Sequence, residues 1–112
     1  QVRSWTAPDG SCRIAFHGHD TYGMGVANVA AAWEAGCDVI DSAAGGLGGC
    51  PFAPGATGNV ATEDVAWLFR RMGVETGLDW SKLLAAADLA AGVPGGMPGG
   101  RLRQVPAARR VG

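Results

Sequence analysis

Hydrophobic residues recur along the chain at intervals that predict a helix between two short strands. The helix is expected between residues 22 and 34, where four apolar side chains follow the i, i+3, i+4, i+7 spacing of one helical face: Val26, Val29, Ala30 and Trp33. Short apolar runs at 14–16 and 37–41 flank it, and each is followed or closed by polar residues. The pattern predicts a strand, a helix and a second strand, in that order.

Two further helices are expected after a long loop. The second should start from Thr62 as N-cap and stop at Gly73, with one apolar face made by Val65, Leu68, Phe69 and Met72. The third should start at Asp79, with an apolar face made by Trp80, Leu83, Leu84 and Ala87. From Ala91 onward the chain is rich in Gly, Pro and Arg, which predicts a flexible surface tail.

This order of elements is typical of an α/β fold with parallel strands joined by right-handed crossovers. Two parallel strands do not make a stable sheet, because such sheets need both faces covered. We therefore expect the sheet to be completed by residues outside this chain. The expected organisation is an irregular lead-in over 1–12, one α/β unit over 13–90, and the tail over 91–112.

Composition narrows the function classes. The chain has 112 residues, and 47% of them are hydrophobic, which excludes disorder throughout. Nine basic and ten acidic side chains give a net charge of −1, so binding to nucleic acid or to an anionic membrane is not expected. No apolar run is long enough to cross a membrane, and no leader is visible. Three cysteines without a CxxC motif favour a reduced, cytoplasmic setting.

The first candidate for chemistry is the sequence His17-Gly18-His19. Residues i and i+2 of a strand point to the same side, so both imidazoles converge. At the carboxyl end of a parallel strand, where the active sites of α/β enzymes lie, the pair can provide two metal ligands. The alternative is two partly solvated histidines at the end of a strand, and the spacing alone does not decide between them.

The second candidate is the Gly-rich loop over 43–59. Long loops without secondary structure are usually functional, and glycines let backbone N–H groups approach a ligand closely. Cys50 lies in the middle of this loop. A loop thiol can ionise and act as base or nucleophile. A neutral cysteine covered by the loop is the alternative.

Residues 16–64 resemble the C-terminal part of the 3-hydroxy-3-methylglutaryl-CoA (HMG-CoA) lyase family. The motif HxHDTxG, present as HGHDTYG, marks the wider superfamily of metal-dependent aldolases and Claisen-type synthases. The segments GLGGCP, GATGN and ATED are more specific, since sister families generally lack the cysteine loop. The resemblance implies that the chain is the C-terminal fragment of a (β/α)8 TIM barrel, comprising its last parallel strands and helices.

The resemblance also implies a site that binds Mg²⁺ or Mn²⁺. His17, His19 and Asn59 match the family's metal ligands, and the position of His17 is also credited with proton transfer. Cys50 matches the catalytic cysteine of the loop that closes over the substrate. Imidazole and oxygen ligands suit a hard divalent ion, which leaves the cysteine for proton chemistry.

Other matched positions are less decisive. Glu63 and Asp64 match acidic residues that affect activity in the family, although stabilisation of a helix N-terminus would also explain both. Gly46, Gly48 and Gly49 belong to the loop expected to cover the substrate. The family's N-terminal DRDGxQ-type motif is absent from this chain, and with it the aspartate metal ligand and the catalytic arginine.

The implied activity of the intact parent is cleavage of HMG-CoA to acetyl-CoA and acetoacetate by retro-Claisen chemistry. The family also suggests leucine degradation. The intact parent is expected to be a cytoplasmic homo-oligomer, with the acyl-CoA as its partner molecule. The 112 residues alone are expected to be inactive. The alternatives are another aldolase, acyl-CoA lyase or synthase of the superfamily, and a non-catalytic truncated remnant.

Overall fold

The structure, a computed structural model, describes residues 9–49 and 57–110. Three α-helices, two strands and several short 3-10 turns follow one another in this part of the chain. In chain order they are β1 (Ala15–His17), η2 (Thr21–Gly23), α1 (Gly25–Glu34), β2 (Val39–Asp41), η3 (Ala44–Gly46), α2 (Thr62–Arg71), α3 (Trp80–Ala91), η4 (Leu102–Gln104) and η5 (Ala107–Arg109). The predicted α/β class and the order of its elements are confirmed.

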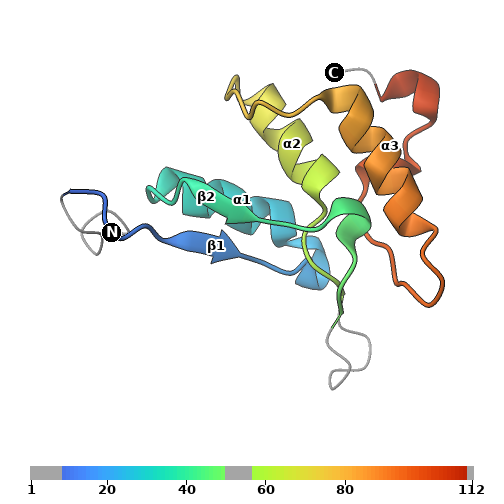
Figure 1. Cartoon of the computed structure of the whole chain (residues 1–112), viewed down its shortest axis with the longest axis horizontal. Coiled ribbons are helices and arrows are strands. Elements are labelled where there is room, and N and C mark those ends of the chain that lie inside the picture. Colours follow the sequence, from blue (N-terminus) through green and yellow to red (C-terminus); the bar gives the residue numbers. More distant parts are fainter. Residues whose placement is uncertain (1–8, 50–56, 111–112) are drawn as a thin grey trace.

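β1 and β2 form a two-stranded parallel sheet, with α1 as the crossover between them. In this pairing His17 lies opposite Asp41. The first strand therefore lies one residue later than the predicted run 14–16, because the ladder extends to the first histidine. In Figure 1 the two strands lie beside α1 at one end of the molecule, with α3 and the C-terminal turns at the other.

The core lies where α1 and α2 pack against the sheet. Val29, Val60, Val65 and Phe69 are its buried members, and the side chain of Trp33 packs edge-on against Phe69 with ring centroids 5.2 Å apart. These contacts confirm most of the predicted apolar faces of both helices. The exception is a residue at the C-cap of α2, Met72, which is 41% exposed because the helix ends there and the chain turns away.

The predicted helix starts are correct at α3 and wrong in detail at α2. Asp79 is the N-cap of α3, and its side chain accepts a hydrogen bond from the backbone N–H of Lys82 at 3.1 Å. At α2, however, Ala61 is the N-cap and Thr62 is the first helical residue. The Thr62 hydroxyl instead bonds the hydroxyl of Ser42, the residue after β2, at 2.7 Å. A tertiary contact has replaced the local cap.

The C-terminal tail makes more contacts than a flexible extension would. The backbone N–H of Gly99 donates to the carbonyl of Gly45 at 2.8 Å, and Leu102 is buried. Near the end of the tail, the guanidinium of Arg110 pairs with Asp88 of α3, while its carbonyl accepts from the Trp80 indole at 2.8 Å. The tail thus forms hydrogen bonds with both η3 and α3.

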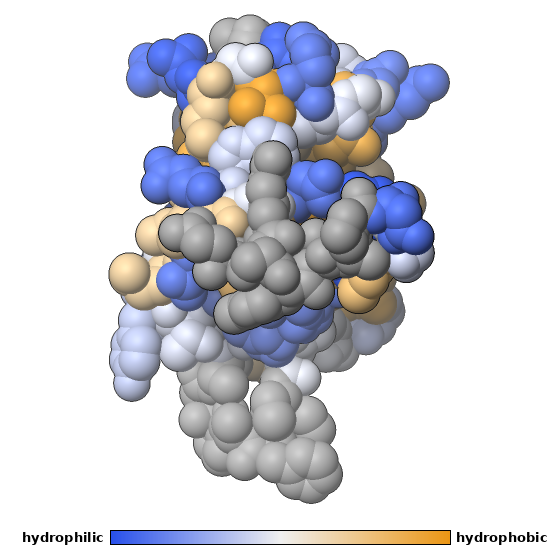
Figure 2. Space-filling view, turned by 90° about the vertical axis from the view of Figure 1, so that its left-hand side faces the viewer, coloured by the Kyte–Doolittle hydropathy of each residue, from blue (hydrophilic) through white to orange (hydrophobic). Residues whose placement is uncertain are grey.

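On the face that Figure 2 shows, small hydrophobic patches alternate with hydrophilic residues. No helix within 9–49 and 57–110 is long and apolar enough to cross a membrane. Of the cysteines in these ranges, Cys12 is exposed and Cys37 is buried, and both are free thiols.

Candidate metal and catalytic site

Both histidines lie at the carboxyl end of β1, as predicted. His17 is the last residue of the strand, and its ring centroid lies 5.3 Å from that of His19. His19 pairs with Asn59 in an isolated antiparallel bridge, and the backbone N–H of Val60 donates to the Gly18 carbonyl at 3.0 Å. The bridge brings all three predicted metal ligands to one place, although His19 and Asn59 lie 40 positions apart in the chain.

Each imidazole is held through its Nδ1 atom. Nδ1 of His17 lies 2.6 Å from a carboxylate oxygen of Asp41, and Nδ1 of His19 lies 3.2 Å from the carbonyl oxygen of Thr57. Carboxylates and carbonyls accept hydrogen bonds, so both rings carry a proton on Nδ1. The lone pair of each neutral ring is then on Nε2. Metal-binding histidines have this arrangement when their other ring nitrogen donates to a carboxylate or a backbone carbonyl.

The carboxamide of Asn59 is oriented so that its oxygen remains available. Its Nδ2 donates to the Leu47 carbonyl at 2.9 Å, and its backbone N–H donates to the Gly48 carbonyl at 3.1 Å. Its Oδ1 is buried and has no hydrogen-bond partner. Buried polar atoms are rarely left without a partner, so this oxygen fits a ligand to a cation.

The residues present therefore fit a divalent ion, with two imidazole nitrogens and one amide oxygen. No group of three or more His, Cys, Asp or Glu side chains within the described ranges could hold a metal ion. The amide oxygen of Asn59 is thus essential to a three-ligand set. A mixed nitrogen and oxygen set of this kind suits Mg²⁺ or Mn²⁺ better than a thiophilic ion.

The glycine loop is structured at both of its described ends, which differs from the uninterrupted loop predicted over 43–59. Residues 44–46 form η3, and Ala43 bridges to Ala61. Gly46 and Gly48 both have a positive φ, and a Cβ on Gly48 would lie 2.6 Å from Nδ2 of Asn59. Gly49 lies in irregular, exposed backbone. Cys50 falls outside the described residues, and its predicted role stays a prediction.

Glu63 lies beneath this loop. It is fully buried, and one carboxylate oxygen accepts the backbone N–H of Gly45 at 3.0 Å while the other has no hydrogen-bond partner. Burial raises the pKa of the Glu63 carboxyl above its usual 4.5, since the charged form loses its hydration. This hydrogen bond gives Glu63 a structural role, which is to stabilise η3. Its predicted catalytic role stays a prediction.

Replacing Glu63 with glutamine is expected to remove a pH dependence of stability. Because the pKa is raised in the folded state, its contribution to the free energy of unfolding is fully present below about pH 4.5 and is lost as pH rises through the raised pKa. Glutamine keeps an acceptor for Gly45 and carries no charge. At pH 7 we expect Glu63→Gln to be more stable than the wild type by about 1 kcal/mol. Urea unfolding at several pH values measures this, with the exposed Glu34→Gln as matched control. Identical pH profiles for Glu63→Gln and the wild type would contradict it.

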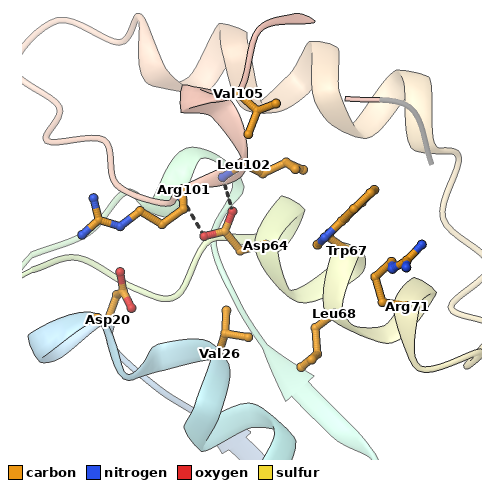
Figure 3. A pocket seen from close by; sticks show the side chains of 10 residues that line it. Asp20, Val26, Asp64, Trp67, Leu68, Arg71, Arg101, Leu102 and Val105 are labelled. Carbon is orange, nitrogen blue, oxygen red and sulfur yellow. Dashed lines mark hydrogen bonds between the residues drawn. The ribbon is translucent and has the colours of Figure 1, made fainter. Parts of the chain in front are cut away.

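Asp64 holds the C-terminal tail. Its two carboxylate oxygens accept the backbone N–H groups of Arg101 and Leu102 at 2.8 and 2.9 Å (Figure 3). The alternative interpretation, that this acid only stabilises the N-terminus of α2, is incomplete, because its hydrogen bonds go to a segment 37 and 38 residues away. The chemical role predicted for Asp64 stays a prediction.

A pocket of about 510 Å³ lies between α1, α2 and η4, next to Asp64. Its walls are mainly apolar, with Val26, Trp67, Leu68 and Leu102 contributing side chains (Figure 3). The two histidines and Asn59 do not line it. It is therefore a separate feature from the candidate metal site.

Sequence reasoning missed Asp41 and Thr57 as partners of the histidines. In the sequence, Asp41 is simply the polar residue that closes the apolar run 37–41. Its position at the end of the second strand could have revealed the contact. When two parallel strands pair in register, their last residues lie side by side. Thr57 gave no such signal, since its contact uses the backbone carbonyl and depends on the path of the loop.

A family model described as HMGL-like matches residues 3–90, which is most of the chain. The chain belongs to the HMGL-like family. Over 75 residues it is 52% identical to the cytoplasmic HMG-CoA lyase of Rattus norvegicus, covering 67% of this chain and 22% of the relative. Over another 75-residue alignment it is 52% identical to (R)-citramalyl-CoA lyase of Chloroflexus aurantiacus, covering 67% and 24%. The chain thus spans less than a quarter of the length of these lyases.

Among solved structures, the chain is similar to an HMG-CoA lyase from Acinetobacter baumannii in complex with coenzyme A and 3-methylmalate. The TM-score is 0.79 at 35% identity, and the match covers 99% of this chain and 35% of that one. The tail is therefore included in the structural likeness. The resemblance to HMG-CoA lyases is confirmed. Relatives of both cytoplasmic and mitochondrial description exist, so a cytoplasmic location stays a prediction.

Proposed function

We propose that this chain forms the C-terminal part of a TIM-barrel lyase that cleaves HMG-CoA to acetyl-CoA and acetoacetate with Mg²⁺ or Mn²⁺. The observation that carries the proposal is the convergence of His17, His19 and the unpartnered Oδ1 of Asn59 at the end of β1. Acyl-CoA specificity is supported by the lyase relatives and by the coenzyme A complex of the structural neighbour. The incomplete two-stranded sheet supports a longer parent.

The reaction breaks a carbon–carbon bond next to a tertiary hydroxyl. The hydroxyl must lose its proton, and the carbon of the leaving acetyl-CoA enolate must gain one. When bound, a divalent ion supplies Lewis acidity that lowers the pKa of a coordinated hydroxyl and orients the substrate. His17, His19 and Asn59 would hold that ion through Nε2, Nε2 and Oδ1.

The contact with Asp41 restricts what His17 can do. With its Nδ1 proton donated to the carboxylate, the only free nitrogen of the neutral ring is Nε2. This atom would serve as ligand while it is bound to the ion, and as proton acceptor only while it is not. Cys50 is then the group proposed for the second proton transfer, from the Gly-rich loop that excludes water from the intermediate.

Replacing Cys50 with serine tests this assignment. In the full-length enzyme we expect kcat for HMG-CoA to fall by about 10²- to 10⁴-fold with little change in KM, because serine is a far weaker acid than a thiol. Cys12→Ser is the matched control, since Cys12 is exposed and lies outside the candidate site. A full rate for Cys50→Ser would favour an aldolase or synthase of the superfamily instead.

A second candidate substrate is citramalyl-CoA, since one relative of equal identity is named (R)-citramalyl-CoA lyase. Both compounds are 3-hydroxyacyl-CoA esters that a retro-Claisen lyase can cleave. Assays of the full-length enzyme on each, with and without Mg²⁺, discriminate them by kcat/KM. Loss of turnover on chelation is expected in either case. Absence of turnover on both would leave the chain as a non-catalytic remnant. The proposed link to leucine degradation and the proposed homo-oligomer apply if the full-length enzyme cleaves HMG-CoA.

A further inference from the structure

We infer that Asp41 is a positioning residue for His17, which fixes the imidazole in one tautomer and one orientation. This inference rests on the proposed function, because it concerns the same candidate metal site. The relevant observation is the 2.6 Å separation between Nδ1 of His17 and Oδ2 of Asp41. That distance is short for a hydrogen bond between nitrogen and oxygen, as expected when the acceptor is charged.

The backbone provides this contact. His17 and Asp41 are partners in the parallel ladder, each at the last position of its strand. Side chains at paired positions leave the sheet on the same side, so the register alone brings the carboxylate to the ring. A shift of the pairing by one residue would turn one of the two side chains to the opposite side of the sheet.

The contact is not explained by a contribution to folding. The two side chains are 52% and 62% exposed in the described chain, and exposed ion pairs contribute little to stability. The neighbouring acid Asp38 makes an ordinary surface pair with Arg13 at 3.1 Å, with exposures of 58% and 63%. Asp38 is therefore a matched control, since it is a carboxylate of similar exposure in the same segment without a histidine partner.

The chemical consequence concerns which nitrogen bears the lone pair. In a free neutral imidazole the proton favours Nε2 in water, whereas a carboxylate at Nδ1 reverses that preference. With Asp41 in place, the neutral ring carries its lone pair on Nε2 and is already oriented before any ion arrives. Removing the carboxylate leaves a ring that must change tautomer and lose rotational freedom on binding, which weakens binding of the ion. Loss of such an outer partner typically lowers metal affinity 10- to 100-fold.

The experiment compares Asp41→Ala, Asp41→Asn and Asp38→Asn in the full-length enzyme with ¹⁵N-labelled histidine. In the metal-free wild type and Asp38→Asn, the ring nitrogens of His17 should show the Nδ1–H tautomer. Asp41→Ala should shift them toward Nε2–H and weaken Mg²⁺ and Mn²⁺ binding by calorimetry 10- to 100-fold. Asp41→Asn keeps an acceptor oxygen and should fall between these two. If Asp41→Ala does not fold, the intermediate tautomer population and metal affinity expected for Asp41→Asn test the inference instead.

The inference is overturned if Asp41→Ala keeps the Nδ1–H tautomer, or if its metal affinity equals that of the wild type. A failure of the proposed function would give a different experimental result. There the wild type itself would bind no divalent ion or cleave no acyl-CoA, while the tautomer measurement would still show whether Asp41 positions His17. The metal-free spectra therefore separate the two questions.

Discussion

The 112 residues by themselves are expected to show no turnover of HMG-CoA and to bind Mn²⁺ only weakly. None of the three proposed ligands, His17, His19 and Asn59, is anionic, and carboxylates are a main source of affinity for such ions. The resemblance to HMG-CoA lyases places the remaining aspartate ligand and the catalytic arginine in an N-terminal motif that this sequence lacks. Without that arginine, charge that develops on the enolate loses a stabilising contact often worth several kcal/mol.

The structure adds a second reason to expect no activity from these residues alone. β1 and β2 are only two of the strands that the proposed closed barrel would need, and both histidines lie at the carboxyl end of β1. A closed barrel limits side-chain motion around its site, whereas here the side chain of His17 is 52% exposed. Calorimetric titration with Mn²⁺ and an acetoacetate assay on the purified chain measure both expectations. The control is the full-length enzyme in the same buffer. Micromolar affinity together with measurable cleavage by the chain alone would contradict them.

Local periodicity predicted the helices well because their apolar faces pack as the spacing requires. Val29 and Phe69 are buried at the positions expected from the i, i+3, i+4, i+7 pattern. Residues whose role depends on distant contacts were harder to predict. The residues around Thr62 predict that its hydroxyl caps the helix. In the structure this hydroxyl instead forms a hydrogen bond with the hydroxyl of Ser42, twenty residues earlier.

The same limit applies to the acidic pair at the start of α2. Spacing indicates a favourable interaction with the helix dipole for Glu63 and Asp64, which is a local property. Their hydrogen bonds go instead to Gly45 and to the tail at 101–102. Neither partner could be found by periodicity, because loops and tails have no repeating pattern that fixes their path. The site histidines were found because both belong to one short motif.

The predicted metal ligands are an intermediate case. Convergence of His17 and His19 follows from strand geometry, but Asn59 entered only through the resemblance to a family. The structure now supplies a physical reason for including it. The sequence alone predicts neither the bridge between Asn59 and His19 nor the unpartnered Oδ1 of Asn59. Asp41 is the reverse case, since its place in the register was inferable once the two strands had been aligned.

Replacing His17 with alanine in the full-length enzyme is expected to reduce kcat by about 10³-fold or more at limiting Mn²⁺. The change removes a proposed ligand nitrogen, and it also removes the group that the resemblance credits with proton transfer, each worth orders of magnitude in rate. His19→Ala should lower metal affinity comparably, since its Nε2 is the second proposed imidazole ligand. Arg13→Ala is the control, because Arg13 precedes β1 and pairs only with Asp38 in the described chain.

A titration of each variant with Mn²⁺ separates the two roles of His17. Loss of a ligand alone raises the metal concentration needed for activity, and saturating Mn²⁺ should restore kcat. Loss of a proton acceptor leaves kcat low however much metal is added. We expect His19→Ala to recover most of its rate at saturation and His17→Ala to remain at least about 10²-fold below the wild type. Equal recovery of both variants would make His17 a ligand only. A His17→Ala rate within tenfold of the wild type at limiting Mn²⁺ would remove His17 from the site altogether.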